Sequence, residues 1–196
     1  MDVVDKNTVS VLMKNDSVAI VDIQQNHVQY IRNNAIPNSS NAFIYIENEF
    51  YISDKYGIVV IDMSGSVKRR ITLSFTPCDM CYDVDSQRIY CIDSEHSQLI
   101  CIDRDGNDIF TFTDPNMTNL TDLTIDNEGN VLVLCEPEVD NSKHVIKVDS
   151  NGEKSEEVIT NINISTSLHC PRICYDHSTN SVVIGLDDKV YIYKKK

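Results

Sequence analysis

Two pairs of closely spaced cysteines are the residues of this sequence best suited to chemistry. They form the motifs Cys78-Asp-Met-Cys81 and Cys170-Pro-Arg-Ile-Cys174. Four thiolates can bind zinc in a tetrahedral site. Residues three apart in an extended strand, however, point to opposite faces, which does not suit joint ligation. We therefore expect buried or half-buried thiols, and we expect no metal and no cofactor.

Two further patterns resemble functional sites only superficially. His169 precedes Cys170, but adjacent residues in a strand point away from each other, and no third group is evident to orient the histidine. The acidic stretch at 103–108, Asp-Arg-Asp-Gly-Asn-Asp, lacks the glycine at position six and the terminal glutamate of a calcium loop. Asp and Asn are ordinary turn formers, so we interpret this stretch as a turn.

The charge balance restricts the class of partner. The 196 residues include 17 Lys and Arg against 30 Asp and Glu, a net charge of −13. Binding to a phosphate backbone needs clustered Lys and Arg. Such clusters occur only at residues 68–70 and 194–196, which argues against nucleic acid and anionic membranes. The absence of a long apolar run, the acidic N-terminus and the odd number of cysteines, seven, predict a cytoplasmic protein with reduced thiols and no membrane.

The elements that position these residues are predicted to be strands. The sequence has 23 Ile and 20 Val but only 9 Leu and 3 Ala. β-Branched side chains pack well on a pleated sheet and lose rotamer freedom in a helix. No stretch sustains an apolar period of 3.6 residues, so we expect no helix longer than one turn.

A repeat organises these strands. Similar apolar runs end at residues 22, 62, 103, 149 and 193, with spacings of 40 to 46 residues. Three of them lead into Asp-x-x-Gly, which ends at Gly65, Gly106 and Gly152. Glycine at this place suits a tight turn or bulge that needs positive φ.

Four strands fit each period. The third repeat is the clearest, with strands at 79–84, 88–93, 98–103 and 108–113. Four-stranded units at this spacing predict a single all-β domain over 1–196, a partial β-propeller of about five four-stranded blades. The expected blades are 1–35, 36–75, 76–116, 117–163 and 164–196. The first has at most a stub of its first strand at 2–4, and the last lacks its fourth strand. A β-sandwich is the structural alternative, but it does not explain the equal spacing.

The repeat resembles the NHL-like propeller at the C-terminus of tripartite-motif (TRIM-type) proteins. Pro77, Asp85, Asp93 and the turn Asp103-Arg-Asp-Gly106 follow the order of that family's blade pattern. Three further segments match it: Tyr51-Ile-Ser-Asp54, Tyr90-Cys-Ile-Asp93 and Asp126-Asn-Glu-Gly129-Asn-Val131. The WD40 pattern is absent, since the chain has no Trp.

The resemblance implies a fold and a function. Family propellers usually close with six blades, so five repeats imply an open or incompletely closed ring and a chain truncated at the N-terminus. The implied function is non-enzymatic recognition of a protein partner or substrate for a ubiquitin ligase, whose activity would reside in a RING domain that this chain lacks. Two alternatives stay open, an RNA-binding propeller and a metal-dependent hydrolase or lyase. For the latter, the polar residues on the first strands of the blades are Asp79, Asp83, Asp122 and Thr124.

The expected partner-binding face consists of loops. In a propeller, the loops between the second and third strands and those between blades share one face, and loops often carry function. This face would hold Tyr56, His96, the loop 136–143 with Lys143, and the pair Asp187 and Asp188. We expect a protein partner there, with Tyr56 as an anchor, while a solvated polar rim is the alternative. The sequence leaves the oligomeric state open.

Overall fold

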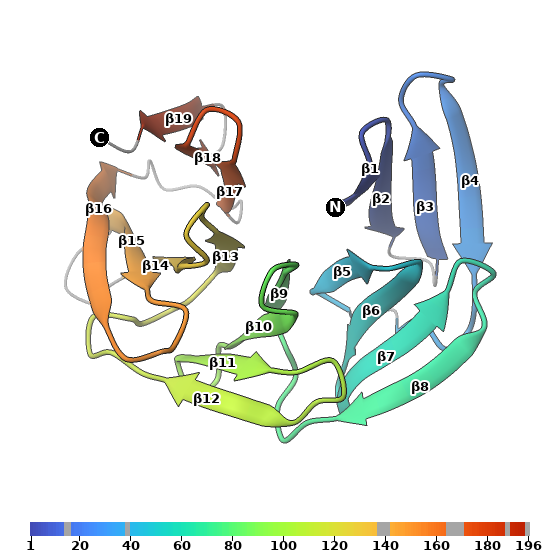
Figure 1. Cartoon of the computed structure of the whole chain (residues 1–196), viewed down its shortest axis with the longest axis horizontal. Coiled ribbons are helices and arrows are strands. Elements are labelled where there is room, and N and C mark those ends of the chain that lie inside the picture. Colours follow the sequence, from blue (N-terminus) through green and yellow to red (C-terminus); the bar gives the residue numbers. More distant parts are fainter. Residues whose placement is uncertain (14–16, 38–39, 137–141, 164–170, 187–188, 195–196) are drawn as a thin grey trace. The chain divides into compact units, whose positions relative to one another are not determined.

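The computed structural model describes residues 1–13, 17–37, 40–136, 142–163, 171–186 and 189–194. These residues form nineteen β-strands and no helix (Figure 1). The all-β class predicted from the excess of Ile and Val is confirmed. Within the described residues, no helix has the length and apolarity needed to cross a membrane.

The chain divides into two compact units, residues 1–78 and 79–196. Unit 1 contains two antiparallel sheets whose strands follow chain order. The first sheet has strands β1 (Asp2–Asp5), β2 (Thr8–Met13), β3 (Ser17–Asp22) and β4 (His27–Arg32). The second has strands β5 (Phe43–Ile46), β6 (Glu49–Asp54), β7 (Gly57–Asp62) and β8 (Val67–Thr72).

Unit 2 contains three more sheets, again with strands in chain order. The third sheet has β9 (Asp79–Asp83), β10 (Arg88–Asp93), β11 (Gln98–Ile102) and β12 (Asp108–Phe112). The fourth has β13 (Asp122–Ile125), β14 (Val131–Cys135), β15 (Ser142–Val148) and β16 (Ser155–Asn163). The fifth has three strands, β17 (Arg172–Asp176), β18 (Ser181–Leu186) and β19 (Lys189–Lys194). We call the strands of each sheet a, b, c and d in chain order.

The sheets agree closely with the predicted repeats, with one correction. The predicted stub at 2–4 is a complete strand, β1, whose Asp2 and Val3 pair with Ser10 and Val9 of β2. Its four residues are too few to show an apolar pattern in the sequence. The fifth sheet lacks a strand d in the described residues, as predicted.

The apolar core lies between successive sheets of each unit. In unit 1, side chains of the first sheet such as Val18 and Ile31 pack with Phe50, Val59 and others of the second. In unit 2, the fourth and fifth sheets bury a matching cluster: Leu132, Leu134, Val145, Ile159, Ile162, Ile173, Tyr175, Ile184 and Leu186. Each sheet is thus apolar on a face that its neighbour covers, because a single small sheet cannot bury its own faces.

The Asp-x-x-Gly turns connect strands c and d as predicted. In the turn at 149–152, the N–H of Gly152 donates to the carbonyl of Asp149 at 2.9 Å, and the Asp149 carboxylate accepts the backbone N–H of Lys154 at 2.9 Å. These backbone hydrogen bonds lower the pKa of Asp149. The turns at Asp62 and Asp103 repeat both features, with φ of +85° at Gly65 and +90° at Gly106.

Gly152 also connects two sheets, and this generates a prediction. A Cβ on Gly152 (φ +69°) would lie 2.4 Å from the Phe110 ring of β12, whereas a Cβ on Gly129 (φ +78°) would meet nothing closer than 3.7 Å. Gly129→Ala should therefore cost only the left-handed backbone, about 1–2 kcal/mol. Gly152→Ala should lower the free energy of unfolding by about 2–4 kcal/mol, since it adds a steric clash.

Urea denaturation of both variants measures the difference. When Phe110→Ala is already present, adding Gly152→Ala should cost little more than the left-handed backbone, because the ring that clashes with the new Cβ is gone. Equal losses in the two single variants would contradict the packing of Phe110 beneath this turn.

Candidate functional site

Carboxylates on strands a join successive sheets. The Asp79 carboxylate on β9 accepts the N–H of Leu123 on β13 at 3.0 Å. Asp122 on β13 accepts the N–H of Ile173 on β17 at 2.6 Å. In unit 1, Asp2 on β1 accepts the N–H of Tyr45 on β5 at 2.6 Å. These bonds satisfy strand-edge amides that no sheet ladder reaches.

Asp79 and Asp122 form a closely coupled carboxyl pair. Burial raises the pKa of Asp79 well above its usual value, and the hydrogen bond and charge repulsion with Asp122 raise this pKa further. Arg172 on β17 lies 3.4 Å from Asp122 and partly offsets the negative charge. The pair thus links the third, fourth and fifth sheets.

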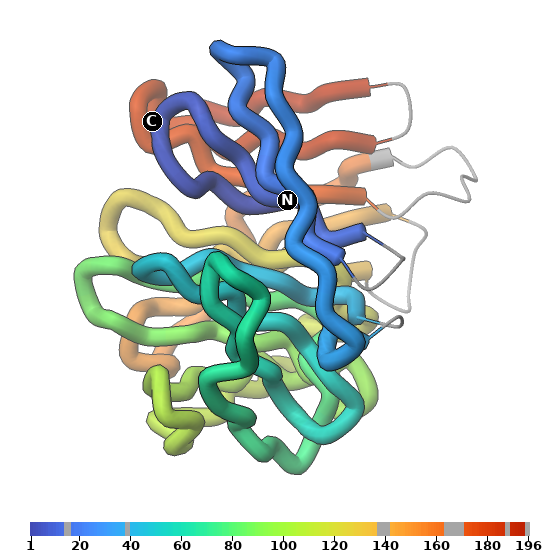
Figure 2. The backbone as a smooth tube through the Cα atoms, turned by 90° about the vertical axis from the view of Figure 1, so that its right-hand side faces the viewer, coloured from blue at the N-terminus to red at the C-terminus, as the bar shows by residue number. Residues whose placement is uncertain are grey.

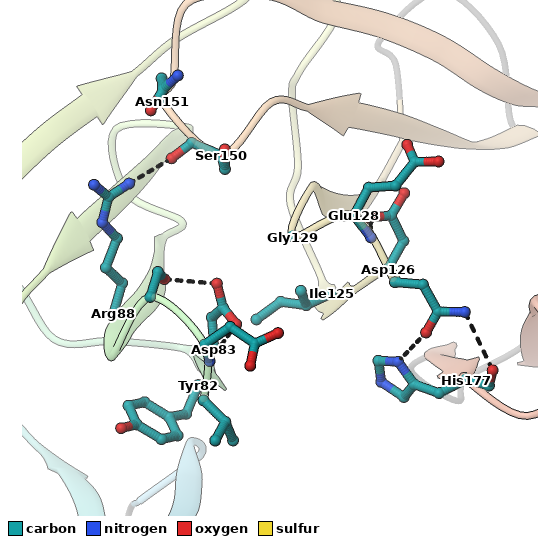
Figure 3. Close-up of a pocket in the computed structure, with 14 residues that line it drawn as sticks. Tyr82, Asp83, Arg88, Ile125, Asp126, Glu128, Gly129, Ser150, Asn151 and His177 are labelled. Atoms are coloured by element: carbon teal, nitrogen blue, oxygen red, sulfur yellow. Dashed lines mark hydrogen bonds between the residues drawn. The ribbon is translucent and has the colours of Figure 1, made fainter.

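A polar hollow of about 610 Å³ opens over the a–b turns of unit 2 (Figure 3). The turns after β9, β13 and β17 contribute Asp83, Asp126 and His177, and the c–d turn after β15 contributes Ser150. Arg88 donates to the carbonyl of Ser150 at 2.7 Å across the hollow. The sequence analysis did not predict this hollow. The residues occupy equivalent turn positions in successive repeats, and this signal would have placed them at one end of the unit.

Two carboxylates that line this hollow accept hydrogen bonds from the turns in which they lie. Asp83 accepts from the N–H of Asp85 and the hydroxyl of Ser86, and Asp126 accepts from the N–H groups of Glu128 and Asn130. Across the described residues, no group of three His, Cys, Asp or Glu side chains has the geometry to hold a metal ion. Asp79, Asp83, Asp122 and Thr124, the strand-a residues considered for a metal-dependent enzyme, instead bind backbone or turn groups.

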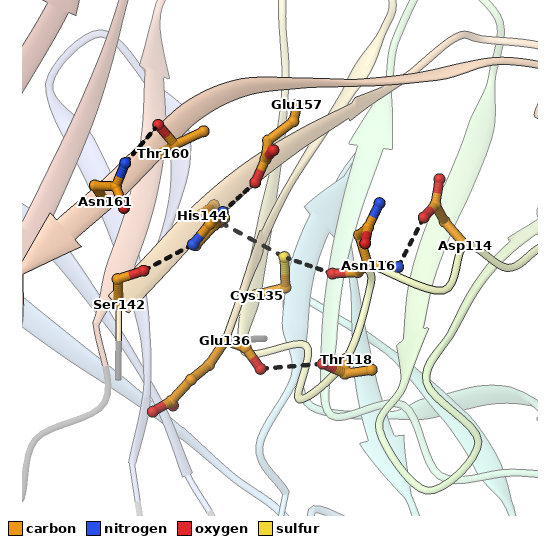
Figure 4. A network of polar contacts seen from close by, with 10 residues as sticks. All are labelled: Asp114, Asn116, Thr118, Cys135, Glu136, Ser142, His144, Glu157, Thr160 and Asn161. Atoms are coloured by element: carbon orange, nitrogen blue, oxygen red, sulfur yellow. Dashed lines mark hydrogen bonds and ion pairs between the residues drawn. The ribbon is translucent and has the colours of Figure 1, made fainter. Parts of the chain in front are cut away.

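Ser142, His144 and Glu157 form a chain in the order of a hydrolase triad (Figure 4). The Ser142 hydroxyl lies 2.7 Å from Nε2 of His144, and Nδ1 of His144 contacts the Glu157 carboxylate. Ser142 is only 7% exposed, and these three residues line neither this polar hollow nor a smaller hollow of unit 1 beside Tyr56. A triad needs room for the reacting carbonyl and its oxyanion. The geometry favours a polar link between β15 and β16.

The thiols are poorly suited to nucleophilic chemistry. Burial raises the pKa of Cys101 to about 11 and that of Cys135 to about 12, and it raises the pKa of Cys81 well above the usual value. A protonated thiol is a weak nucleophile and metal ligand. The Cys78 side chain is half-buried. His169 and Cys170 lie outside the described residues, while Cys174 is exposed and free.

Tyr56 lies in the b–c turn of the second sheet, as predicted, and is 65% exposed. It lines a hollow of about 340 Å³ together with Lys55, Ile58, Ile71 and others of unit 1. The Lys55 ammonium stands 4.5 Å from the centre of the Tyr56 ring, a cation–π distance. We call this surface the Tyr56 hollow.

Two of the three residues in the basic cluster at 68–70 are paired with carboxylates of the second sheet. Arg69 pairs with Glu49 at 3.0 Å and Arg70 pairs with Asp54 at 2.7 Å. Arg70 also lines the Tyr56 hollow, so this surface carries charges of both signs. Arginines already paired with carboxylates offer little to a phosphate backbone.

The other predicted face residues differ in their surroundings. His96 lies in the b–c turn of the third sheet, where Nδ1 contacts the Asp93 carboxylate at 2.7 Å, and this contact raises the pKa of His96. Asp187 and Asp188 lie outside the described residues. The loop placement of Lys143 is wrong, because it lies within β15, is 5% exposed and pairs with Glu136. Because the Lys143 ammonium is buried and already paired with Glu136, Lys143 is poorly placed to contact another protein.

Comparison with solved structures identifies the fold. A chain of a nidogen/laminin complex superposes with a TM-score of 0.73 at 11% identity, over 96% of this chain and 78% of that one. The chain has the β-propeller fold. A streptogramin B lyase superposes with a TM-score of 0.63 at 12% identity, over 99% of this propeller and 67% of the lyase chain. A protein described as a putative gluconolactonase (TM-score 0.64, 13% identity) covers 94%, with 73% of its own chain matched.

These comparisons show the fold of the propeller and leave its activity to be proposed. No family model matches the sequence, and no curated protein matches it. The five sheets are the five predicted blades, and the β-sandwich alternative is wrong. The incomplete closure of the ring and the tripartite-motif context stay predictions.

The coupled pair generates a prediction about stability and pH. A carboxyl whose pKa is raised in the folded state stabilises the fold below its unfolded pKa, and this contribution is lost as the pH rises through the folded pKa. Asp79→Asn keeps an acceptor for Leu123 and cannot ionise. We expect this variant to be more stable than the wild type at pH 7.5, by about 1–2 kcal/mol, with the difference vanishing near pH 4.

Thermal and urea unfolding at the two pH values test this expectation. Asp79→Ala is the matched variant, because it removes the acceptor as well as the charge and should be less stable than Asp79→Asn throughout. If Asp79→Asn were less stable than the wild type at pH 7.5, the coupled pair would not be a source of strain.

Proposed function

We propose that this chain is a non-enzymatic protein-interaction propeller. The Tyr56 hollow carries the proposal, because it combines an exposed aromatic ring, an adjacent cation and apolar walls. Tyr and Arg are enriched where binding energy concentrates in protein interfaces. The nidogen/laminin complex supports it by precedent, since a chain with a similar fold is part of a protein complex there.

The finer role that we propose is partner or substrate recognition for a ubiquitin ligase of the tripartite-motif type. Its support is the sequence resemblance carried by the Asp-x-x-Gly turns and the strand endings at Asp54 and Asp93. The acidic net charge of −13 favours protein over nucleic acid as the partner. In a ligase that carries this propeller, Tyr56→Ala should then reduce ubiquitination of the recognised protein without changing autoubiquitination.

Capture of partners by the immobilised chain tests the Tyr56 hollow. We expect Tyr56→Ala to weaken retention of a specific partner about tenfold or more, as loss of an aromatic anchor does. Tyr30→Ala is the matched control, because Tyr30 is 53% exposed on β4 of the same unit and does not line the hollow. Equal retention by the two variants would remove the Tyr56 hollow from the proposal.

The lyase and gluconolactonase neighbours make a separate test of enzyme activity worthwhile. A fluorophosphonate probe, which labels activated serines, should leave the chain unlabelled, because Ser142 is buried within β15. Intact-protein mass spectrometry detects any adduct. Labelling that is lost in Ser142→Ala and in His144→Ala would contradict the non-enzymatic proposal and establish the triad.

A further inference from the structure

Among the described residues, strand β19 of the fifth sheet has no partner strand along its outer edge. In each of the other four sheets, strand c lies between strands b and d. In the described part of the fifth sheet, β19 occupies the position of strand c and pairs only with β18, from Leu186↔Lys189 to Ser181↔Lys194. The strands of this sheet are the red segments near the C-terminus in Figure 2. Its outer N–H and C=O groups therefore form a ready template for another strand.

The side chains of β19 alternate between two faces. Tyr191 and Tyr193 stack with ring centres 6.5 Å apart and pack on the core of unit 2. Val190 and Ile192 point to the other face and are 67% and 63% exposed. A strand added at this edge would cover apolar surface on both faces, because diagonal and directly opposite residues contact across strands.

The fourth sheet shows what such a strand supplies. There β16 pairs with strand c, and its Ile159 and Ile162 are buried in the same core on which Tyr191 and Tyr193 pack. In the described fifth sheet, nothing occupies the matching position beside the two tyrosines. An incoming strand with apolar residues at alternate positions would complete this layer.

Charge indicates the chemistry of that strand. In the fourth sheet, Glu156 of β16 forms an ion pair with Lys147 of β15, and Glu157 contacts the His144 ring. Strand β19 has Lys189 at one end and Lys194 at the other. Both lysines are exposed and have no ion pair among the described residues. The complement of this edge is therefore acidic.

We propose that the free edge of β19 binds an extended acidic segment of a partner protein as an antiparallel fourth strand. The segment would place apolar side chains beside Tyr191 and Tyr193 and carboxylates near Lys189 and Lys194. Backbone hydrogen bonds would supply the affinity, and the alternating side chains would supply the specificity. This site is independent of the Tyr56 hollow, which lies in unit 1.

A peptide with the sequence of β16, Ser-Glu-Glu-Val-Ile-Thr-Asn-Ile-Asn, is the probe. It has an N-terminal fluorophore and a free C-terminal carboxylate, which in the antiparallel orientation would lie near Lys189. Fluorescence anisotropy measures binding, and hydrogen exchange of the intact chain locates it. We expect saturable binding and slower exchange of β19 amides.

Three comparisons separate strand addition from charge attraction. Lys189→Glu/Lys194→Glu should weaken binding about tenfold, whereas Lys6→Glu/Lys68→Glu, with the same change of net charge in unit 1, should leave it nearly unchanged. A peptide with Pro in place of Ile159 should not bind, since Pro interrupts the ladder. Tyr56→Ala should bind the peptide like the wild type, so failure here and failure of the Tyr56 hollow are distinguishable.

Several results would overturn the proposal. They are no binding up to about 1 mM peptide, equal binding by the two charge-reversed variants, or a bound peptide that leaves the β19 amides unprotected. Protection of β19 that appears with rising protein concentration alone, together with a dimer in sedimentation, would assign the edge to a second copy instead of a partner.

Discussion

Each sheet of this propeller is too small to bury its own faces, and the rest of the structure follows from that constraint. In the second, third and fourth sheets, strands b and c are mostly buried, as in β14, where all five residues are buried. Such a sheet is stable only when a neighbour covers it. Side chains that fix the spacing of adjacent sheets, such as Phe110 beneath Gly152, therefore matter as much as those within a sheet.

Apolar contact between sheets is non-directional, and the polar links provide what it lacks. The strand-a carboxylates specify which amide of the next sheet lies opposite, so they fix the relative height of two sheets that could otherwise slide. Burial of a carboxylate costs free energy, and the raised pKa of Asp79 reflects that cost. The hydrogen bond that aligns two sheets therefore also destabilises the fold when Asp79 is ionised. Specificity and stability are thus in partial conflict on strands a.

Much of the fold was predictable because it is local. The Ile and Val content, the spacing of 40 to 46 residues and the Asp-x-x-Gly turns are short-range features, and each strand of the third sheet lies within one residue of its expected bounds. The candidate site was less accessible to prediction. The position of Tyr56 in a turn follows from the hairpin, but the burial of Lys143 depends on how far β15 extends, and the pairing of Asp79 with Asp122 depends on residues 43 positions apart.

The link between strands a has a direction, and in the fifth sheet its pattern changes. The residue that corresponds to Asp79 and Asp122 is Arg172, a donor without an acceptor oxygen in its side chain, and its guanidinium reaches back to Asp122. A duplicate of the fourth sheet would contain the strand-a carboxylate that accepts an amide of the next sheet, so another sheet could be aligned on it. A duplicate of the fifth sheet would lack this acceptor. Any sheet stacked on the outward face of β17–β19 would have to be aligned by some other means, so this substitution limits how the repeat could have been extended in evolution.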